Sequence, residues 1–83
     1  MKYTQYFLYK RKRPDRADIK DEWIERAINE AIQTQIQSDG RIRKWVKIEE
    51  VNRYLRVILL PDGETVHNVF FDRDYQEAKK DED

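Results

Sequence analysis

The sequence predicts an α+β fold in which one main helix packs on one face of a four- to five-stranded antiparallel sheet, in the order β-α-β-β-β-β. The observations behind this are a single stretch with helical spacing of apolar residues, later stretches with alternating apolar residues, and two Asp-Gly turns. With 83 residues, the chain has room for one core. We therefore assign residues 1–72 to a single domain and residues 73–83 to a charged C-terminal tail.

The first element expected is a strand over residues 3–9, YTQYFLY, because aromatic residues are enriched in strands. The next stretch, KRKRPDRAD, contains a proline and almost no apolar residue, so it is predicted to be a loop. Asp18 is a good N-cap for the helix that follows, and Asp21 and Glu22 would complement the helix dipole in its first turn.

That helix has one apolar stripe, whose members follow helical spacing: Trp23, Ile24, Ala27, Ile28, Ala31 and Ile32. Its other positions are mostly charged, and Glu22 and Arg26 stand four apart, where they can form an ion pair. A helix with a single apolar stripe buries one side only. We therefore expect it to lie across a sheet.

Two strands are expected around the turn at Asp39-Gly40, since both residue types tolerate the positive φ angles of tight hairpins. After this turn the residues alternate between two faces. One face carries Ile42, Lys44, Val46 and Ile48, and the other carries Arg41, Arg43, Trp45 and Lys47. Such alternation is typical of a sheet with one covered side. Residues 49–53 are predicted to form the next turn.

The last two strands are YLRVILL (54–60) and TVHNVFF (65–71), joined by the turn PDGE. Their apolar content predicts that they are central in the sheet. Strict alternation would place Leu55, Val57 and Leu59 on one face of the first strand. In the second strand it would separate Val66, Asn68 and Phe70 from Thr65, His67, Val69 and Phe71.

Composition excludes several classes of protein. The chain has no cysteine, which excludes disulfides and cysteine-ligated zinc, and with one histidine we expect no metal site and no cofactor. No apolar run is long enough to span a membrane, and the N-terminus lacks the order of a signal peptide, so a cytoplasmic protein is expected. Net charge is zero, but residues 2–16 and 41–56 are strongly basic whereas 18–30 and 72–83 are acidic. This sorting is either a basic footprint for nucleic acid or an ordinary solvated surface.

The candidate catalytic residues are His67, Arg56 and Arg43. His67 is the only side chain whose ordinary pKa is near neutrality, so it could act as acid or base while the arginines hold a phosphate. The alternative is that His67 is a strand residue without a role. Arg56 could equally extend to water along its stem or pair with an acid such as Glu64.

The candidate nucleic-acid-binding residues are Arg11, Arg13, Arg41, Trp45, Lys47 and Tyr54. Basic residues interleaved with aromatic ones can form a surface on which bases stack. They can also simply surround a half-buried tryptophan, and KRKR could be no more than a solvated loop. If the sheet carries a helix on one side only, these cations and His67 could meet on the open face.

Three segments together resemble the small toxin-like domains of the RelE, barnase and colicin ribonuclease fold, and in particular a branch of unassigned function. They are YTQYFLYKRKRPDRADIKDEWIERAI, DGRIRKWVKI and YLRVILLPDGETVHNVFF, within residues 3–71. That branch opens with threonine-x-histidine and a basic loop. Here Thr4 and Arg11 match, and Tyr6 stands where the histidine would be. The resemblance implies ribonuclease activity, or a degenerate relative without it.

Two functional hypotheses follow from the sequence. One is a non-enzymatic binding or structural module whose partner is RNA, DNA or a protein. The other is a ribonuclease toxin, or a degenerate relative, that binds RNA on the open sheet face and is covered by an antitoxin-like protein. The sequence leaves the oligomeric state open.

Overall fold

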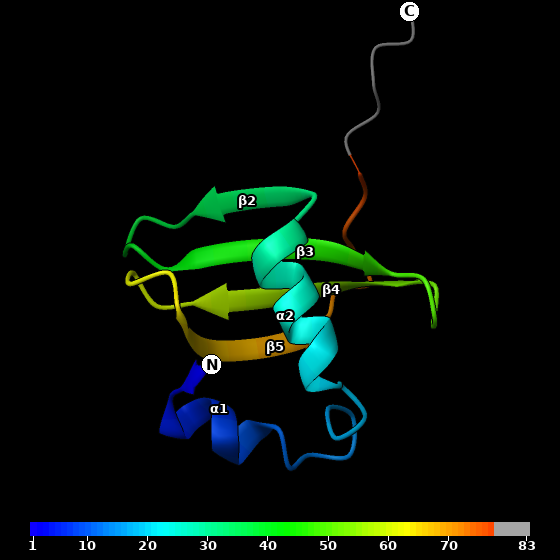
Figure 1. Ribbon diagram of the computed structural model, residues 1–83, viewed down its shortest axis with the longest axis horizontal. Coiled ribbons are helices and arrows are strands. Elements are labelled where there is room, and N and C mark those ends of the chain that lie inside the picture. Colours follow the sequence, from blue (N-terminus) through cyan, green and yellow to red (C-terminus); the bar gives the residue numbers. More distant parts are fainter. Residues whose placement is uncertain (78–83) are drawn as a thin grey trace, which may run out of the picture.

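The computed structural model describes residues 1–77, which form a five-stranded sheet and two helices (Figure 1). The elements are β1 (Lys2–Tyr3), α1 (Gln5–Lys10), α2 (Asp21–Glu30), β2 (Gln33–Ile36), β3 (Ile42–Ile48), β4 (Arg53–Leu59) and β5 (Thr65–Phe71). The strand order is β1-β5-β4-β3-β2. The predicted α+β class is confirmed. The sheet is mixed, however, because β1 runs parallel to β5 while the other neighbours are antiparallel. Of the predicted C-terminal tail, residues 78–83 lie outside the described part of the chain.

The strand predicted over residues 3–9 is wrong. Only Lys2–Tyr3 is extended, and Thr4 then caps α1 by accepting a hydrogen bond from the backbone N–H of Phe7 at 3.0 Å. Within α1 only Phe7 is buried, which suits a helix that touches the core once in its two turns. Threonine capping and the burial of Phe7 therefore outweigh the strand propensity of the aromatic residues.

The main helix is shorter than predicted at both ends. Its N-cap is Lys20 rather than Asp18, and no side chain caps it. It ends at Glu30, and the chain then turns so that Ile32 is 48% exposed and donates its backbone N–H to Trp45 of β3. Ala31 and Ile32 thus leave the predicted stripe, because the chain must turn here to enter β2.

Both predicted Asp-Gly turns are confirmed. Gly40 has φ +91° between β2 and β3, and Gly63 has φ +74° between β4 and β5. In the second turn the Asp62 carboxylate accepts hydrogen bonds from the backbone N–H groups of Glu64 and Thr65 and from the Thr65 hydroxyl. These bonds lower the pKa of Asp62 to about 2, the largest cause being the Thr65 hydroxyl.

Strand β5 contains one extra residue. Leu59 pairs with Val66 and Ile58 pairs with Asn68, so His67 has no partner of its own in β4. Such a bulge reverses the alternation of all later residues. As a result Val66 and Val69 both lie in the core, whereas the predicted alternation had put them on opposite faces.

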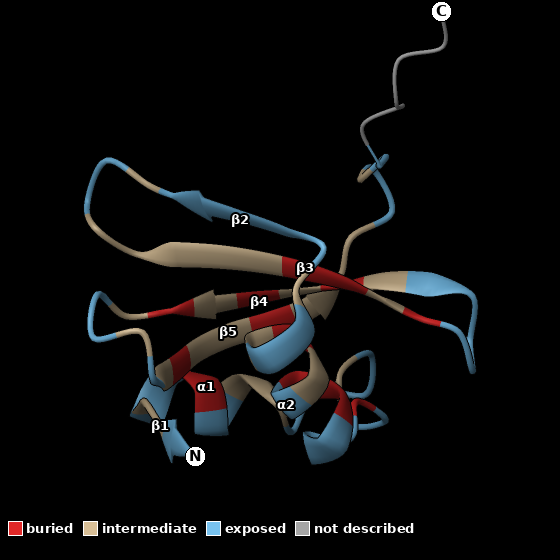
Figure 2. Cartoon of the chain, turned by 45° about the horizontal axis from the view of Figure 1, so that its top comes forward, coloured by how far each residue is buried: buried red, intermediate tan, exposed pale blue. Residues whose placement is uncertain are grey.

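The core lies between the two helices and one face of the sheet (Figure 2). Helix α2 contacts β3 and β4, and α1 contacts β5 at the edge of the sheet. The buried residues of α2 are Trp23, Ile24 and Ala27, and they meet Leu55, Val57 and Leu59 of β4. The other face of the sheet has no helix among residues 1–77 (Figure 2), and on that face Tyr75 stacks on Trp45 of β3. No helix within the described residues is long and apolar enough to cross a membrane.

Candidate nucleic-acid interface

The sheet face opposite α2 holds an open hollow of about 420 Å³, which we call the arginine hollow. Its lining comes from α1, the β2–β3 turn and strands β3 to β5: Tyr6, Gln37, Arg41, Arg43, Arg56, Ile58, His67, Asn68 and Phe70. Three of these side chains are cationic, and no carboxylate of the described residues lines the hollow. The lining side chains therefore carry net positive charge, although Arg41 lies 3.8 Å from Asp39 Oδ2 and Arg56 lies 3.4 Å from Asp72 Oδ2.

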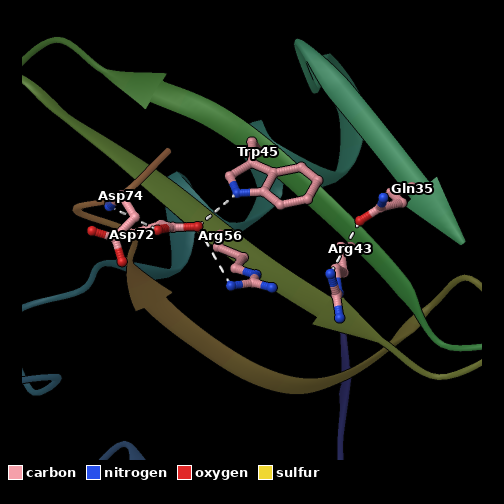
Figure 3. Close-up of polar contacts among 6 residues, drawn as sticks. All are labelled: Gln35, Arg43, Trp45, Arg56, Asp72 and Asp74. Carbon is pink, nitrogen blue, oxygen red and sulfur yellow. Dashed lines mark hydrogen bonds and ion pairs between the residues drawn. The ribbon is translucent and has the colours of Figure 1, made fainter. Parts of the chain in front are cut away.

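Two arginines stand side by side on neighbouring strands (Figure 3). Arg43 Nη1 donates to Gln35 Oε1 at 3.1 Å, and the Arg56 guanidinium lies 5.2 Å from the ring centre of Phe70. The Nε atoms of Arg43 and Arg56 are buried and have no hydrogen-bond acceptor among the described residues. A buried donor without an acceptor is costly, so both arginines hold hydrogen-bonding capacity that the described residues do not satisfy.

The pKa of Arg56 is lowered, chiefly by burial and also by the positive charge of Arg43, while Asp72 opposes this shift. The direction is informative because arginine normally stays charged under all conditions met by proteins. Its lowered pKa follows first from burial, and it persists although Asp72 lies 3.4 Å away.

A fourth arginine, Arg16, which the sequence alone did not single out, contacts two residues that line the hollow. Arg16 Nη1 donates to Asn68 Oδ1 at 3.0 Å, and its guanidinium lies 5.6 Å from the ring centre of Phe70. Its Nε is also buried without a hydrogen-bond acceptor among the described residues. The sequence placed Arg16 in a featureless basic loop, and only the path of that loop past β5 brings it here.

His67 is held by two residues from the start of the chain. Its Nδ1 is 3.1 Å from Thr4 Oγ1, and its ring stacks on Tyr6 with centres 4.8 Å apart and planes at 20°. Thr4 Oγ1 already accepts from the N–H of Phe7, so its own hydrogen is available to Nδ1. In that tautomer Nε2 carries the hydrogen and can donate to a ligand.

The pKa of His67 is lowered, first by burial and then by the positive charge of Arg41. The imidazole is therefore neutral at pH 7. This is the state in which it can serve as a hydrogen-bond donor and, in the other tautomer, as a base.

The predicted site residues fall into three groups. In the first group, His67, Arg41, Arg43 and Arg56 all line the hollow on the open face. Arg11 and Arg13 lie elsewhere. Arg11 pairs with Asp21 at 2.6 Å, which raises its pKa, and Arg13 is 3.7 Å from Asp15.

The third group is the aromatic pair Trp45 and Tyr54, with Lys47 beside it. Trp45 is only 5% exposed, because the ring of Tyr75 stacks on it with centres 5.1 Å apart and planes at 20°. Tyr75 also meets Tyr54 at 5.0 Å. Lys47 lies 5.9 Å from the ring centre of Tyr54. This aromatic surface is thus present but covered by the C-terminal segment.

Sequence reasoning also missed Thr4, Tyr6, Asn68 and Phe70 as neighbours of His67. Thr4 is a residue type favoured at an N-cap, which is the local signal that a helix could begin here, but no Glu or Gln follows three residues later. Asn68 and Phe70 carried no such signal, because their face depends on the bulge at His67.

No group of three or more histidine, cysteine or acidic side chains within residues 1–77 is arranged to hold a metal ion. The polar side chains that line the hollow carry guanidinium, imidazole, amide and phenol groups, all of which can donate hydrogen bonds to an anion. Comparisons of the chain with protein-family models, with curated proteins and with solved structures found no match.

Proposed function

We propose that this chain is a non-enzymatic binding module that holds the phosphate backbone of single-stranded RNA in the arginine hollow. The observation that carries the proposal is the convergence of Arg41, Arg43 and Arg56 on one hollow that no described carboxylate lines. Phosphate contacts supply most of the affinity in nucleic-acid binding, and guanidinium groups match phosphate geometry.

The other groups of the hollow fit the same ligand. His67 Nε2–H can donate to a second phosphate oxygen, and Asn68 and Gln37 offer amides to base edges or to a ribose hydroxyl. A concave site on a sheet accepts a flexible single strand, whose unstacked bases are exposed. Arg11 and Arg13 lie outside the hollow, where they pair with Asp21 and Asp15, so the proposal assigns the phosphate to the hollow alone.

The proposal predicts salt-sensitive binding that depends on the hollow. Arg43→Gln and Arg56→Gln should each weaken binding of a fluorescein-labelled single-stranded RNA about tenfold, because each removes a charge-assisted hydrogen bond to phosphate. The slope of log Kd against log salt should fall by about 0.7 for each phosphate that is no longer neutralised. Fluorescence anisotropy over a series of KCl concentrations measures both quantities.

Lys12→Gln is the matched control, since it removes one positive charge from the loop before α2, outside the hollow. It should change affinity less than twofold. If wild-type protein does not retain RNA at low salt, or if Lys12→Gln weakens binding as much as Arg43→Gln, the hollow is not an RNA site.

The alternative is a ribonuclease toxin-like activity, favoured by the presence of His67 in the hollow. In cleavage, a base takes the 2′-hydroxyl proton, the 2′-oxygen bonds to phosphorus, and the bond to the 5′-oxygen breaks as that oxygen gains a proton. His67 would act as the base through Nε2, which requires the tautomer in which Nδ1–H donates to Thr4 Oγ1. An antitoxin-like protein partner would then cover the hollow, and a cytoplasmic location is part of both proposals.

The two functions separate at His67→Ala. A ribonuclease loses cleavage and stops arresting growth on expression, while RNA is still retained by the arginines. A binding module never cleaves, and this variant costs it one hydrogen bond, or a few-fold in Kd. Intact labelled RNA after incubation with the wild-type chain, together with free growth of cells that express it, would exclude the ribonuclease.

A further inference from the structure

The C-terminal strap, residues 72–77, lies across the sheet face beside the arginine hollow. Tyr75 stacks on Trp45, and its hydroxyl donates to Gln33 Oε1 at 2.7 Å. Tyr54 donates its hydroxyl to Glu77 Oε2 at 2.8 Å, which raises the pKa of that tyrosine. The strap therefore covers the aromatic surface with an aromatic ring of its own.

At the other end of the strap, Asp72 Oδ2 accepts hydrogen bonds from Trp45 Nε1 at 3.0 Å and from Arg56 Nη1 at 3.4 Å (Figure 3). The Arg56 guanidinium lies between the two sites, 5.4 Å from the ring centre of Trp45 and 5.2 Å from that of Phe70. Arg56 thus belongs to the arginine hollow and to the aromatic surface at once, which makes the two continuous.

We propose that Trp45 and Tyr54 form a base-stacking subsite next to the arginine hollow, and that the strap fills this subsite by imitating a nucleotide. The Tyr75 ring takes the place of a base, and the Asp72 carboxylate takes the place of a phosphate against Arg56. An incoming RNA base replaces Tyr75 on Trp45, and its phosphate replaces Asp72 on Arg56. This inference rests on the RNA binding proposed above.

The strap is held in a way that permits such an exchange. Tyr75 and Glu77 make exposed hydrogen bonds, whereas Asp72 accepts part-buried bonds from Trp45 and Arg56 and donates its backbone N–H to Tyr54 O at 2.9 Å. None of residues 72–77 belongs to the core cluster. Their displacement therefore removes no core packing. A base that stacks on Trp45 takes over the stacking that Tyr75 gives up, so the exchange has little net cost, and the strap tunes affinity rather than blocking the site completely.

The first experiment frees the subsite without removing the strap. Tyr75→Ala should tighten binding of the labelled single-stranded RNA about tenfold, because a base no longer competes with the tyrosine ring for Trp45. Asp72→Asn should also tighten it several-fold, because a neutral amide competes less well with phosphate for Arg56. In the Tyr75→Ala background, Trp45→Ala should remove the gain.

Matched controls separate the strap from general effects of charge and surface. Tyr9→Ala removes a tyrosine that is 72% exposed on α1, and Asp74→Asn makes the same charge change two residues from Asp72. Neither variant should tighten RNA binding by more than about twofold, because a surface substitution away from the site has only a small effect. The indole N–H signal of Trp45, observed by ¹⁵N NMR without RNA, should shift in Tyr75→Ala and stay in place in Tyr9→Ala.

The outcomes distinguish the two proposals. If the wild-type chain binds RNA but Tyr75→Ala binds equally or more weakly, the strap does not compete with a base and this inference fails, while the arginine hollow stands. The inference also fails if Asp74→Asn tightens binding as much as Asp72→Asn. If neither the wild type nor any variant binds RNA at low salt, the proposed function fails and this inference fails with it.

Discussion

At the scale of single residues, His67 shows how placement changes the meaning of a side chain. In the sequence it is an isolated histidine in an apolar strand pattern, which usually marks a position without a role. In the structure it occupies a bulge, stacks on Tyr6, contacts Thr4 and lines a hollow with three arginines. Burial and Arg41 then keep its ring neutral by lowering its pKa.

This environment predicts the titration of His67. Because its folded-state pKa is below the ordinary value, protonation favours the unfolded chain, so stability is complete above about pH 6.5 and declines as the pH falls through the folded-state pKa. NMR titration of the single histidine should give a midpoint below 6.5, the ordinary pKa of the imidazole. His67→Gln should remove this part of the pH dependence of unfolding. A midpoint above 6.5 in the free protein would contradict the effects of burial and of Arg41.

The same titration reports on the ligand. A phosphate bound near His67 would oppose the charge of Arg41 and favour the protonated ring, so RNA should raise the midpoint. Arg41→Gln alone should also raise it, because one of the two causes of the low pKa is removed. An unchanged midpoint with saturating RNA would place the bound strand away from the hollow.

At the scale of elements, α1 and the bulge in β5 act together. The capping hydroxyl of Thr4 starts α1, and the same oxygen contacts His67 in the bulge, 63 positions away in the chain. The backbone N–H of Thr4 also donates to Val66 O at 3.0 Å. Thr4 thereby positions the start of α1, the end of β1 and the imidazole ring of His67.

Thr4→Ala should lower the free energy of unfolding by about 1 kcal/mol, the usual cost of removing an N-cap side chain. Thr4→Ser keeps a hydroxyl at the same place and should retain most of that stability. Urea denaturation followed by tryptophan fluorescence measures the difference. Equal stability of the alanine and serine variants would show that the cap does not support α1.

At the scale of the whole molecule, the domain is stabilised from one side of its sheet. The helices and the inner sheet face share the core cluster, while the outer face carries a charged hollow and a strap. A chain of this length has a narrow margin of stability, since small domains bury a modest share of their surface. The outer face therefore contributes less to the core, and it is the face to which we assign the proposed binding.

Core and surface leucines should respond very differently to truncation. Leu55 is fully buried beneath α2, so Leu55→Ala should cost about 2–5 kcal/mol and leave little folded protein at physiological temperature. Leu8 is 36% exposed on α1, and Leu8→Ala should change the free energy of unfolding by at most about 0.5 kcal/mol. Thermal denaturation followed by circular dichroism compares them. A small effect at Leu55 would mean that the core is not centred on β4.

Local sequence patterns were sufficient to predict those elements whose conformation depends on a few neighbouring residues. The stripe Trp23, Ile24 and Ala27 predicts α2, and the Asp-Gly pairs predict the two hairpins, because helical spacing and positive φ angles leave few other conformations. Tertiary contacts decided the remainder. Phe7 packs in the core from a helix and not from a strand. Strand β5 pairs with β4 only with one extra residue, His67, in its register.

The sequence by itself determined the α+β class, the main helix, the hairpin turns and an unusual supply of arginines, because periodicity and turn chemistry act over a few neighbouring residues. Only the tertiary structure decided that Arg43, Arg56 and His67 share one hollow and that Tyr75 covers Trp45. Those relations depend on a bulge and on the path of two irregular segments. Both are set by packing between residues far apart in the chain, which no local pattern records.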